Sequence, residues 1–410
     1  MRRNAVAIRG IVLIACSLVS ATAITACDPP MPPDVAAAVA ERQLTCLPGT
    51  VTVSVPGDFV GSMTAVGGAL TSACAEQGIE QGASETPDDA TAPVRITPGP
   101  PSAQQIDDFR SNACATGTVV TVPAFAYPVS LAFNAPGYEG IVLSAEAVAG
   151  ILSGTITSFA DPAIQATNEG FDFSGLPPIT VVSSAQASGG VEAMTGWLAQ
   201  QAPQAWTPGA VSTIPATAPV ADQAALLETM IATPSAVTVL PISVALNNGL
   251  GYAGLITQVP GADGQSAQAL PVSPDDPQLA KIGAGATRIL SETSDELIVS
   301  AGVGGIPEPG SFDLAASKIV LAEGQPLAGW PVVGMAHMLV CDEASNPLPK
   351  SFAQYVVRLA GQGALETNGL VPLPEPIRVK TFAPLRVVVD PTDIPSDLLA
   401  TAEPSSVMPS

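Results

Sequence analysis

A loop of small residues follows a short apolar run near the middle of the chain. Ile179 to Val182 has the composition of a buried strand, and the loop Ser188-Gly189-Gly190 comes shortly after it. Apolar residues between Met194 and Leu198 then share one face of a predicted helix. Such a frame can hold an anion, because free backbone N–H groups and the positive end of the helix dipole converge at the helix N-terminus. The sequence therefore predicts a hydrogen-bonding site for a small polar ligand at this loop.

The rest of the sequence offers few residues for covalent catalysis, metal binding or cofactor binding. The single histidine, His337, lies inside an apolar run, where a structural role is expected. A hydrolase nucleophile at Ser188 fails its motif, because Gln186 stands where G-x-S-x-G requires glycine. Acid pairs such as Asp107-Asp108 lack the alternating pattern of a calcium loop and are interpreted as solvated surface. We therefore expect no enzyme activity, no metal and no cofactor.

Length and charge narrow the class of protein. At 410 residues the chain is long enough for two lobes of ordinary size. It carries 36 acidic and 14 basic residues, a net charge of −22, which disfavours nucleic acid and anionic lipid as partners. The same balance gives no long-range attraction for an anion, so an anion site would have to act through local groups.

The N-terminus has the pattern of an export signal. Arginines within the first nine residues form a basic segment, and Ile11 to Val19 is an apolar core too short to span a bilayer comfortably. Ile24-Thr25-Ala26-Cys27 resembles a bacterial lipobox. We therefore expect a signal peptide over residues 1–26 and a lipid on Cys27, which would anchor the protein to the outer face of the cell membrane. Residues 27–47 begin with a proline-rich tether. The alternative is ordinary cleavage and a soluble secreted protein.

Four cysteines would remain after export and lipidation. Cys46, Cys74, Cys114 and Cys341 are an even number suited to two disulfides in an oxidising compartment. Their wide spacing disfavours a metal site. The four residues allow three pairings, of which we favour Cys74–Cys114 with Cys46–Cys341, because the first pair flanks early elements of the chain.

Helices and strands alternate along the chain, which indicates an α/β fold with parallel sheets. Ser144 is expected to cap a helix that ends at Gly154, and Ser62 is expected to cap a helix that runs to Cys74. Pro123 separates two predicted strands. Other strands are predicted at 50–55, 94–97, 119–122, 126–133, 236–240 and 332–341, and other helices at 103–114, 221–232, 242–247 and 350–359.

Several segments resemble one family. They are Ile-Leu-Ser-Gly-Thr-Ile-Thr-Ser-Phe-Ala-Asp-Pro-Ala-Ile at 151–164, Val-Val followed by Ser188-Gly189, Trp-Pro-Val-Val at 330–333 and Gly-Leu-Val-Pro-Leu-Pro at 369–374. In order and spacing they are similar to the phosphate-binding protein of bacterial phosphate ABC importers. The resemblance covers Val51 to Pro374, weakly before Val119 and well after it.

The resemblance implies a two-lobed fold of the periplasmic binding protein type, with chain crossings near Pro123 and Gly329. Lobe I would hold residues 48–122 and 330–376, lobe II residues 123–329, and residues 377–410 would form a loosely held tail. It also implies capture of phosphate or another small polar solute by lobe closure, and presentation of the closed form to an ABC permease. We expect the protein to act as a monomer.

The ligand residues carry over incompletely. The family's Arg position is occupied by Ser184, its second-lobe Asp by Gln186, and its first-lobe Asp falls near Gly99. Glu192, in the first turn of the helix after Ser188, would repel an anion. Arg95, reaching in from the first lobe, is the cation we would look to first. The predicted ligand residues are Ser62, Ser84, Ser184, Gln186, Ser188, Gly189 and Gly190.

Two alternatives stay open at this point. The cleft could hold a neutral or zwitterionic solute through its hydroxyl and amide groups. The scaffold could also be degenerate, with no small ligand, and act as an interaction or regulatory module of the cell envelope.

Overall fold

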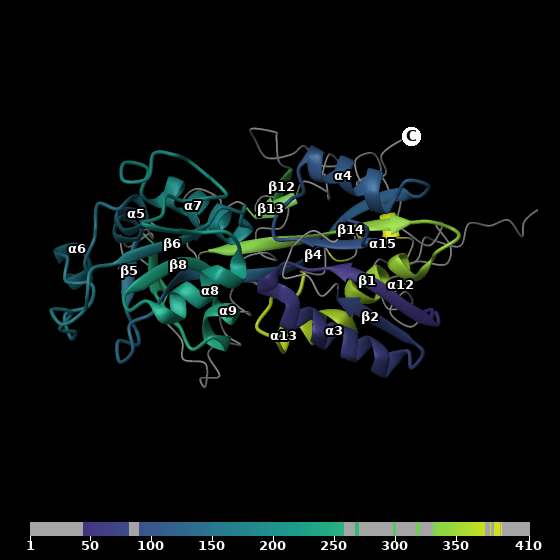
Figure 1. Ribbon diagram of the computed structural model, residues 1–410, viewed down its shortest axis with the longest axis horizontal. Helices are drawn as coiled ribbons and strands as arrows, with labels where there is room; N and C mark the ends of the chain where they lie inside the picture. The colour runs from purple at the N-terminus through teal and green to yellow at the C-terminus, as the bar shows by residue number, and fades with distance from the viewer. Residues whose placement is uncertain are drawn as a thin grey trace, which may run out of the picture.

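The computed structural model describes most of the chain between residues 44 and 387. The described residues are 44–81, 90–257, 267–269, 298–300, 317–319, 330, 332–373, 378, 381–385 and 387. Figure 1 shows two halves arranged along the long axis, with strands β4 (Thr118–Phe133) and β14 (Val333–Asp342) running between them. The molecule is a mixed α/β protein of two lobes, as the sequence predicted.

The first lobe is built on five neighbouring strands. Their order is β2 (Gln77–Gln81), β1 (Gly49–Ser54), β3 (Val94–Thr97), β14 and β4. β1 is parallel to both β2 and β3, whereas β14 is antiparallel to β3 and β4. Figure 1 shows α3 (Val60–Ala73) and α13 (Leu359–Glu366) on one side of these strands and α4 (Ala103–Ala113) on the other. The same lobe includes η1 (Gly57–Phe59), α12 (Leu348–Val356) and α15 (Phe382–Leu385).

The second lobe continues from the far end of β4. The strand order is β4, β8 (Ala236–Pro241), β6 (Thr180–Ser184) and β7 (Ala218–Val220), with β9 (Gly251–Tyr252) also paired to β4. β6 is parallel to β7 and β8. The helices are α5 (Ala145–Ser153), α6 (Pro162–Gln165), α7 (Gly189–Gln201), α8 (Gln223–Ala232) and α9 (Ile242–Asn247). A separate three-stranded sheet joins β5 (Val142–Ser144), β10 (Gly254–Thr257) and β11 (Ala267–Ala269), and β12 (Ile298–Ser300) pairs only with β13 (Ser317–Ile319) among the described strands.

β4 crosses between the lobes as one strand, so the prediction of two strands separated by Pro123 is wrong. β4 pairs with β14 as far as Pro128 and with β8 from Val129. Pro123 is tolerated because the register shifts beside it, which leaves Ala124 unmatched, and a proline without an N–H fits such an irregularity. Trp330, at the second crossing, is buried and donates from Nε1 to the Val129 carbonyl over 2.7 Å.

The sequence predicted one helix cap correctly and one wrongly. Ser144 accepts from the backbone N–H of Ala147 over 3.2 Å, and Gly154 ends α5 in the left-handed conformation, as predicted. The expected cap at Ser62 is wrong, because α3 begins at Val60 and continues from the turn of η1. Ser62 therefore lies inside the first turn of α3 and not at its cap.

Both disulfides belong to the first lobe, but the favoured pairing is wrong. Cys46 is bonded to Cys74 and Cys114 to Cys341. Cys74 follows α3, on the side of the sheet opposite α4, and Cys114 follows α4. Cys114 instead faces Cys341 on β14, because α4 packs against that strand. Nearness in sequence was the wrong guide to pairing.

The described part of the predicted tail is not loosely held. Arg378, Phe382 and Leu385 are buried. Arg378 donates to the Val357 carbonyl over 3.1 Å, and Gln354 donates to the Leu385 carbonyl over 2.8 Å. This segment packs on the first lobe because its apolar side chains find partners near α12. The other lobe boundaries stay predictions.

Three predictions about the N-terminal region lie outside the described residues. These are the signal peptide, the lipid on Cys27 and the greater part of the tether. Among the helices that are described, none has both the length and the apolar character needed to cross a bilayer.

Candidate functional site

A cavity of about 360 Å³ opens between the two lobes. Lobe I contributes the turn after β1, the end of β3 and two side chains of α4, whereas lobe II contributes the loop between β6 and α7 and the start of α8. The lining residues include Asp58, Arg95, Thr97, Gln105, Asp108, Ser183, Ser184, Gln186, Ser188, Ser212, Gln223 and Thr238. The cavity lies at the carboxyl ends of β1, β3 and β6, which is where open α/β sheets bind their ligands.

The lobe II wall offers hydroxyl groups with protons left to donate. Ser184 Oγ accepts from the backbone N–H of Gln186 over 3.0 Å. Ser188 Oγ accepts from the backbone N–H of Val191 over 3.3 Å and so caps α7, at the loop from which the sequence predicted a helix to start. Because each hydroxyl is used as an acceptor, its O–H proton remains for a ligand. The structure thus brings together Ser184, Gln186 and Ser188 among the predicted ligand residues.

Gly189 lies where the lobes meet, outside the cavity lining. A side chain there would place its Cβ 2.0 Å from the Pro98 carbonyl oxygen, which no real contact permits. Only glycine therefore allows α7 to approach the end of β3 this closely. A Cβ on Gly190 would be 3.5 Å from its nearest neighbour, an ordinary contact. Neither glycine contributes to the cavity wall itself.

The other predicted ligand residues are placed less favourably. Ser62 is buried in α3 and does not line the cavity. Ser84 lies outside the described residues. A ligand role for any of the predicted residues stays a prediction.

Arg95 supplies positive charge to the cavity. It is 9% exposed, and among the described residues that line the cavity it is the one cation. Its guanidinium lies over the ring of Phe109, 5.6 Å from the centroid, and its Nε has no hydrogen-bond partner. The aromatic face and burial hold the group in place while leaving a donor unused. An anion in the cavity could satisfy that donor.

Asp58 stands on the same wall and reaches across to the other lobe. Gln223, the first residue of α8, donates from Nε2 to its carboxylate. Asp58 is half-buried at the cavity wall. Its partial burial raises its pKa to about 7, and the bond from Gln223 opposes that rise. The group therefore changes charge near neutral pH.

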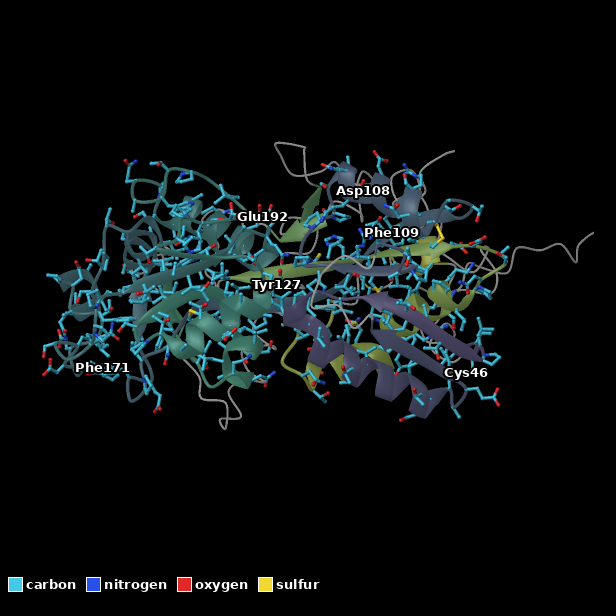
Figure 2. All side chains as sticks on the ribbon, in the orientation of Figure 1. Cys46, Asp108, Phe109, Tyr127, Phe171 and Glu192 are labelled. Atoms are coloured by element: carbon cyan, nitrogen blue, oxygen red, sulfur yellow. A yellow bond between two sulfur atoms is a disulfide. The ribbon has the colours of Figure 1, made fainter. Side chains whose placement is uncertain are left out.

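Tyr127 lies on β4, near the junction of the lobes (Figure 2). Its hydroxyl donates to the Pro98 carbonyl, and burial raises its pKa, with further contributions from Asp58 and Glu192. Figure 2 shows Tyr127 and Glu192 near the junction and Asp108 on α4 across from them. Glu192 occupies the first turn of α7, as predicted, but it is absent from the cavity lining.

Sequence reasoning missed part of the charged wall. Asp58 and Gln223 were not singled out, and Asp108 was interpreted as solvated surface, although it lines the cavity. Asp58 follows β1 by a short turn, and a polar residue at the carboxyl end of a parallel strand is a signal that could have found it. No local pattern indicated Gln223, because its role depends on the other lobe.

Fold and cavity together define a two-lobed binding protein with its site between the lobes. A family model described as the PBP superfamily domain matches residues 64–358, well over half of the chain. The chain therefore belongs to the PBP superfamily, whose members are solute-binding proteins.

Two curated relatives are phosphate-binding proteins by name. The chain is 27% identical over 278 residues to "Phosphate-binding protein PstS2" of Mycobacterium bovis, which covers 65% of this chain and 66% of the relative. The match to "Phosphate-binding protein PstS 2" of Mycobacterium tuberculosis has the same identity and coverage. The chain thus spans a little under two thirds of the length of these relatives.

Solved structures support the fold. A high affinity periplasmic phosphate-binding protein, PfluDING, has a TM-score of 0.54 at 17% identity, with 82% of this chain and 93% of the other covered. The phosphate binding protein of Stenotrophomonas maltophilia has a TM-score of 0.51 at 17% identity, with 80% and 92% covered. At such identities the likeness establishes the two-lobed architecture.

Proposed function

We propose that this protein binds inorganic phosphate in the cavity between its lobes and presents it to the permease of an ABC importer. The names of its relatives motivate the choice of phosphate. The observation that carries the proposal is Arg95, a buried cation with an unused donor at a cavity that otherwise offers hydroxyl and amide groups.

A buried phosphate needs a cation, several donors and a carboxylate that accepts the proton of hydrogen phosphate. Arg95 would replace the family's missing arginine from the opposite lobe. Ser184 and Ser188 would donate through their hydroxyl protons, together with backbone N–H groups at the start of α7. Asp58 would take the part of the family's acidic residues by sharing one proton with the phosphate, because it is the carboxyl group held against the cavity by Gln223.

Capture would follow lobe closure about β4 and β14, and no covalent step is involved. We further propose export, with a lipid on Cys27 that holds the protein at the outer face of the membrane, and action as a monomer. Residues 48–122 with 330–376 would move as one lobe and residues 123–329 as the other.

Calorimetry with phosphate tests the proposal, with sulfate as the competing anion. We expect saturable binding in the micromolar range or tighter, about −8 kcal/mol or more favourable. Sulfate, which brings no proton of its own to share with Asp58, should bind more weakly. A folded, phosphate-free preparation that gives no heat with millimolar phosphate would contradict the proposal and favour another solute or a protein partner.

A further inference from the structure

Asp58 and its hydrogen-bond partner belong to opposite lobes. Asp58 lies in η1, after β1 of the first lobe, whereas Gln223 begins α8 of the second. The contact is close: a Cβ added to Gly57 would lie 3.3 Å from Gln223 Cγ. Separation of the lobes would therefore remove Gln223 from Asp58 and return the carboxyl group to water.

The described surroundings of Asp58 contain acids and one cation, but no ion pair. Helix α3, which packs on η1, carries no ionisable side chain, and α8 carries Asp222 and Glu228. Asp222 is occupied by its own helix, because its carboxylate accepts from the backbone N–H of Ala225 over 2.9 Å. The other ionisable groups at the cavity or the junction are Arg95 on β3, Asp108 on α4, Tyr127 on β4 and Glu192 on α7.

Closure consequently takes part of a carboxylate out of water without giving it a counter-charge. Among the described residues that line the cavity, Arg95 is the one cation, yet it forms a contact with the Phe109 ring and no salt bridge with Asp58. A neutral amide, Gln223, is what the closed state offers instead. Burial without a cation disfavours the charged form of an acid, so the closed state favours protonated Asp58.

We propose that closure of the two lobes takes up one proton at Asp58, so that acidic conditions favour the closed, ligand-holding state and alkaline conditions favour opening. The inference rests on the proposed capture of a solute by lobe closure. The Asp58–Gln223 pair would make lobe closure depend on pH, whichever solute the cavity binds.

The direction follows from linkage. In the closed state the pKa of Asp58 is about 7, against an ordinary value of 3.8 for a carboxyl group in water. The state with the higher pKa holds the proton more tightly and is stabilised relative to the other below that pKa. The advantage of the closed state is thus complete at low pH and is lost as pH rises through about 7. A bound anion next to Asp58 would also raise its pKa, because a second negative charge disfavours the ionised form.

The test counts the protons taken up when phosphate binds at pH 6.0. Any change in the protonation of phosphate itself is common to all variants, so the difference between variants isolates Asp58. Binding heats are measured in two buffers of different ionisation enthalpy for the wild type, for Asp58→Asn and for the matched control Asp107→Asn, an exposed acid on α4 that does not line the cavity. We expect Asp58→Asn to take up about one proton fewer per phosphate than the wild type and Asp107→Asn, which should agree with each other.

Equal uptake in the wild type and Asp58→Asn would overturn the inference, and phosphate binding would stand. If phosphate gives no heat in any variant, the proposed function fails and the inference is decided on the wild type alone. The radius of gyration of the ligand-free wild type is then measured by small-angle X-ray scattering between about pH 4 and about pH 9. A radius that grows as pH rises through about 7 retains proton uptake on closure, and a radius that does not change with pH overturns it. The same measurement decides the matter if Asp58→Asn does not fold.

Discussion

The two walls of the cavity differ in chemistry. The lobe I wall carries the charges, namely Arg95, Asp58 and Asp108. The described lobe II wall carries hydroxyl and amide groups, from Ser184, Gln186 and Ser188, and places the N-terminus of α7 beside them. A ligand would therefore meet its counter-charge on one lobe and most of its neutral donors on the other.

This division teaches that neither wall is a complete anion site. A cation alone leaves the oxygens of a phosphate without enough donors, whereas neutral donors alone leave its charge uncompensated in a desolvated cavity. Strong binding would need both walls at once, which requires closed lobes. Four substitutions test whether the two walls act together.

The largest effect is expected from the charged wall. Arg95→Gln should weaken phosphate binding by about 3 kcal/mol, about 100-fold or more in Kd, because it removes the one described cation that could compensate a buried anion. Calorimetry measures the change. Arg110→Gln is the control, since Arg110 lies on α4, pairs with Asp107 over 2.6 Å and is absent from the cavity lining. Equal affinities for the two variants would refute the role of Arg95.

Closure itself can be obstructed between the walls. Gly189→Ala places a methyl group against the Pro98 carbonyl, where the separation would be 2.0 Å, so the lobes should stop short of closure. We expect a loss of about 2 kcal/mol in phosphate affinity, about 30-fold, from the overpacked contact. Gly190→Ala, one residue further, meets ordinary contacts and should bind like the wild type. If both alanine variants bind equally well, the contact does not control closure.

A smaller effect is expected from the neutral wall. Ser184→Ala removes one hydroxyl donor and should weaken phosphate binding by about 1.5 kcal/mol, about tenfold. Ser158→Ala is a matched control, because Ser158 Oγ likewise accepts from the backbone N–H two residues ahead, that of Ala160 over 3.1 Å, but outside the cavity. An unchanged Kd in Ser184→Ala would show that this wall acts through backbone groups.

The smallest effect concerns the stability of the ligand-free protein. Burial raises the pKa of Asp58 to about 7, so the ionised group destabilises the folded state, and the wild type should lose stability as pH rises from about 4 through about 7. Asp58→Asn should remove this loss and raise Tm by about 2–4 °C at pH 8, with little change at pH 4. Thermal unfolding followed by circular dichroism across this range measures it. Parallel pH profiles for wild type and variant would contradict the assignment.

Local signals predicted much of the fold. The strand over residues 94–97, the helix capped by Ser144 and the helix capped by Ser188 were found because their signals lie within a few residues. The continuity of β4 through Pro123 was not predictable, since it depends on a register shift against β14, more than 200 residues later. The disulfide pairing failed for the same reason: it depends on which face of the sheet α4 covers.

The site was predictable on one wall only. The resemblance to a known family is strong around Ser184 and Ser188, and there the structure does place the predicted side chains at a cavity. Arg95 was considered because a cation was needed and it was the candidate on the first lobe. Asp58 and Gln223 acquire their roles only when the lobes meet, and no spacing within the sequence encodes that meeting.

A crystal structure of the protein grown with phosphate is the most direct test of the central claim. The account predicts a phosphate between the lobes, with Arg95 on one side, the Ser184 and Ser188 hydroxyls on the other, and Asp58 close enough to accept or share a proton. A phosphate bound elsewhere, or a closed cavity that excludes it while Arg95 remains on Phe109, would contradict the account.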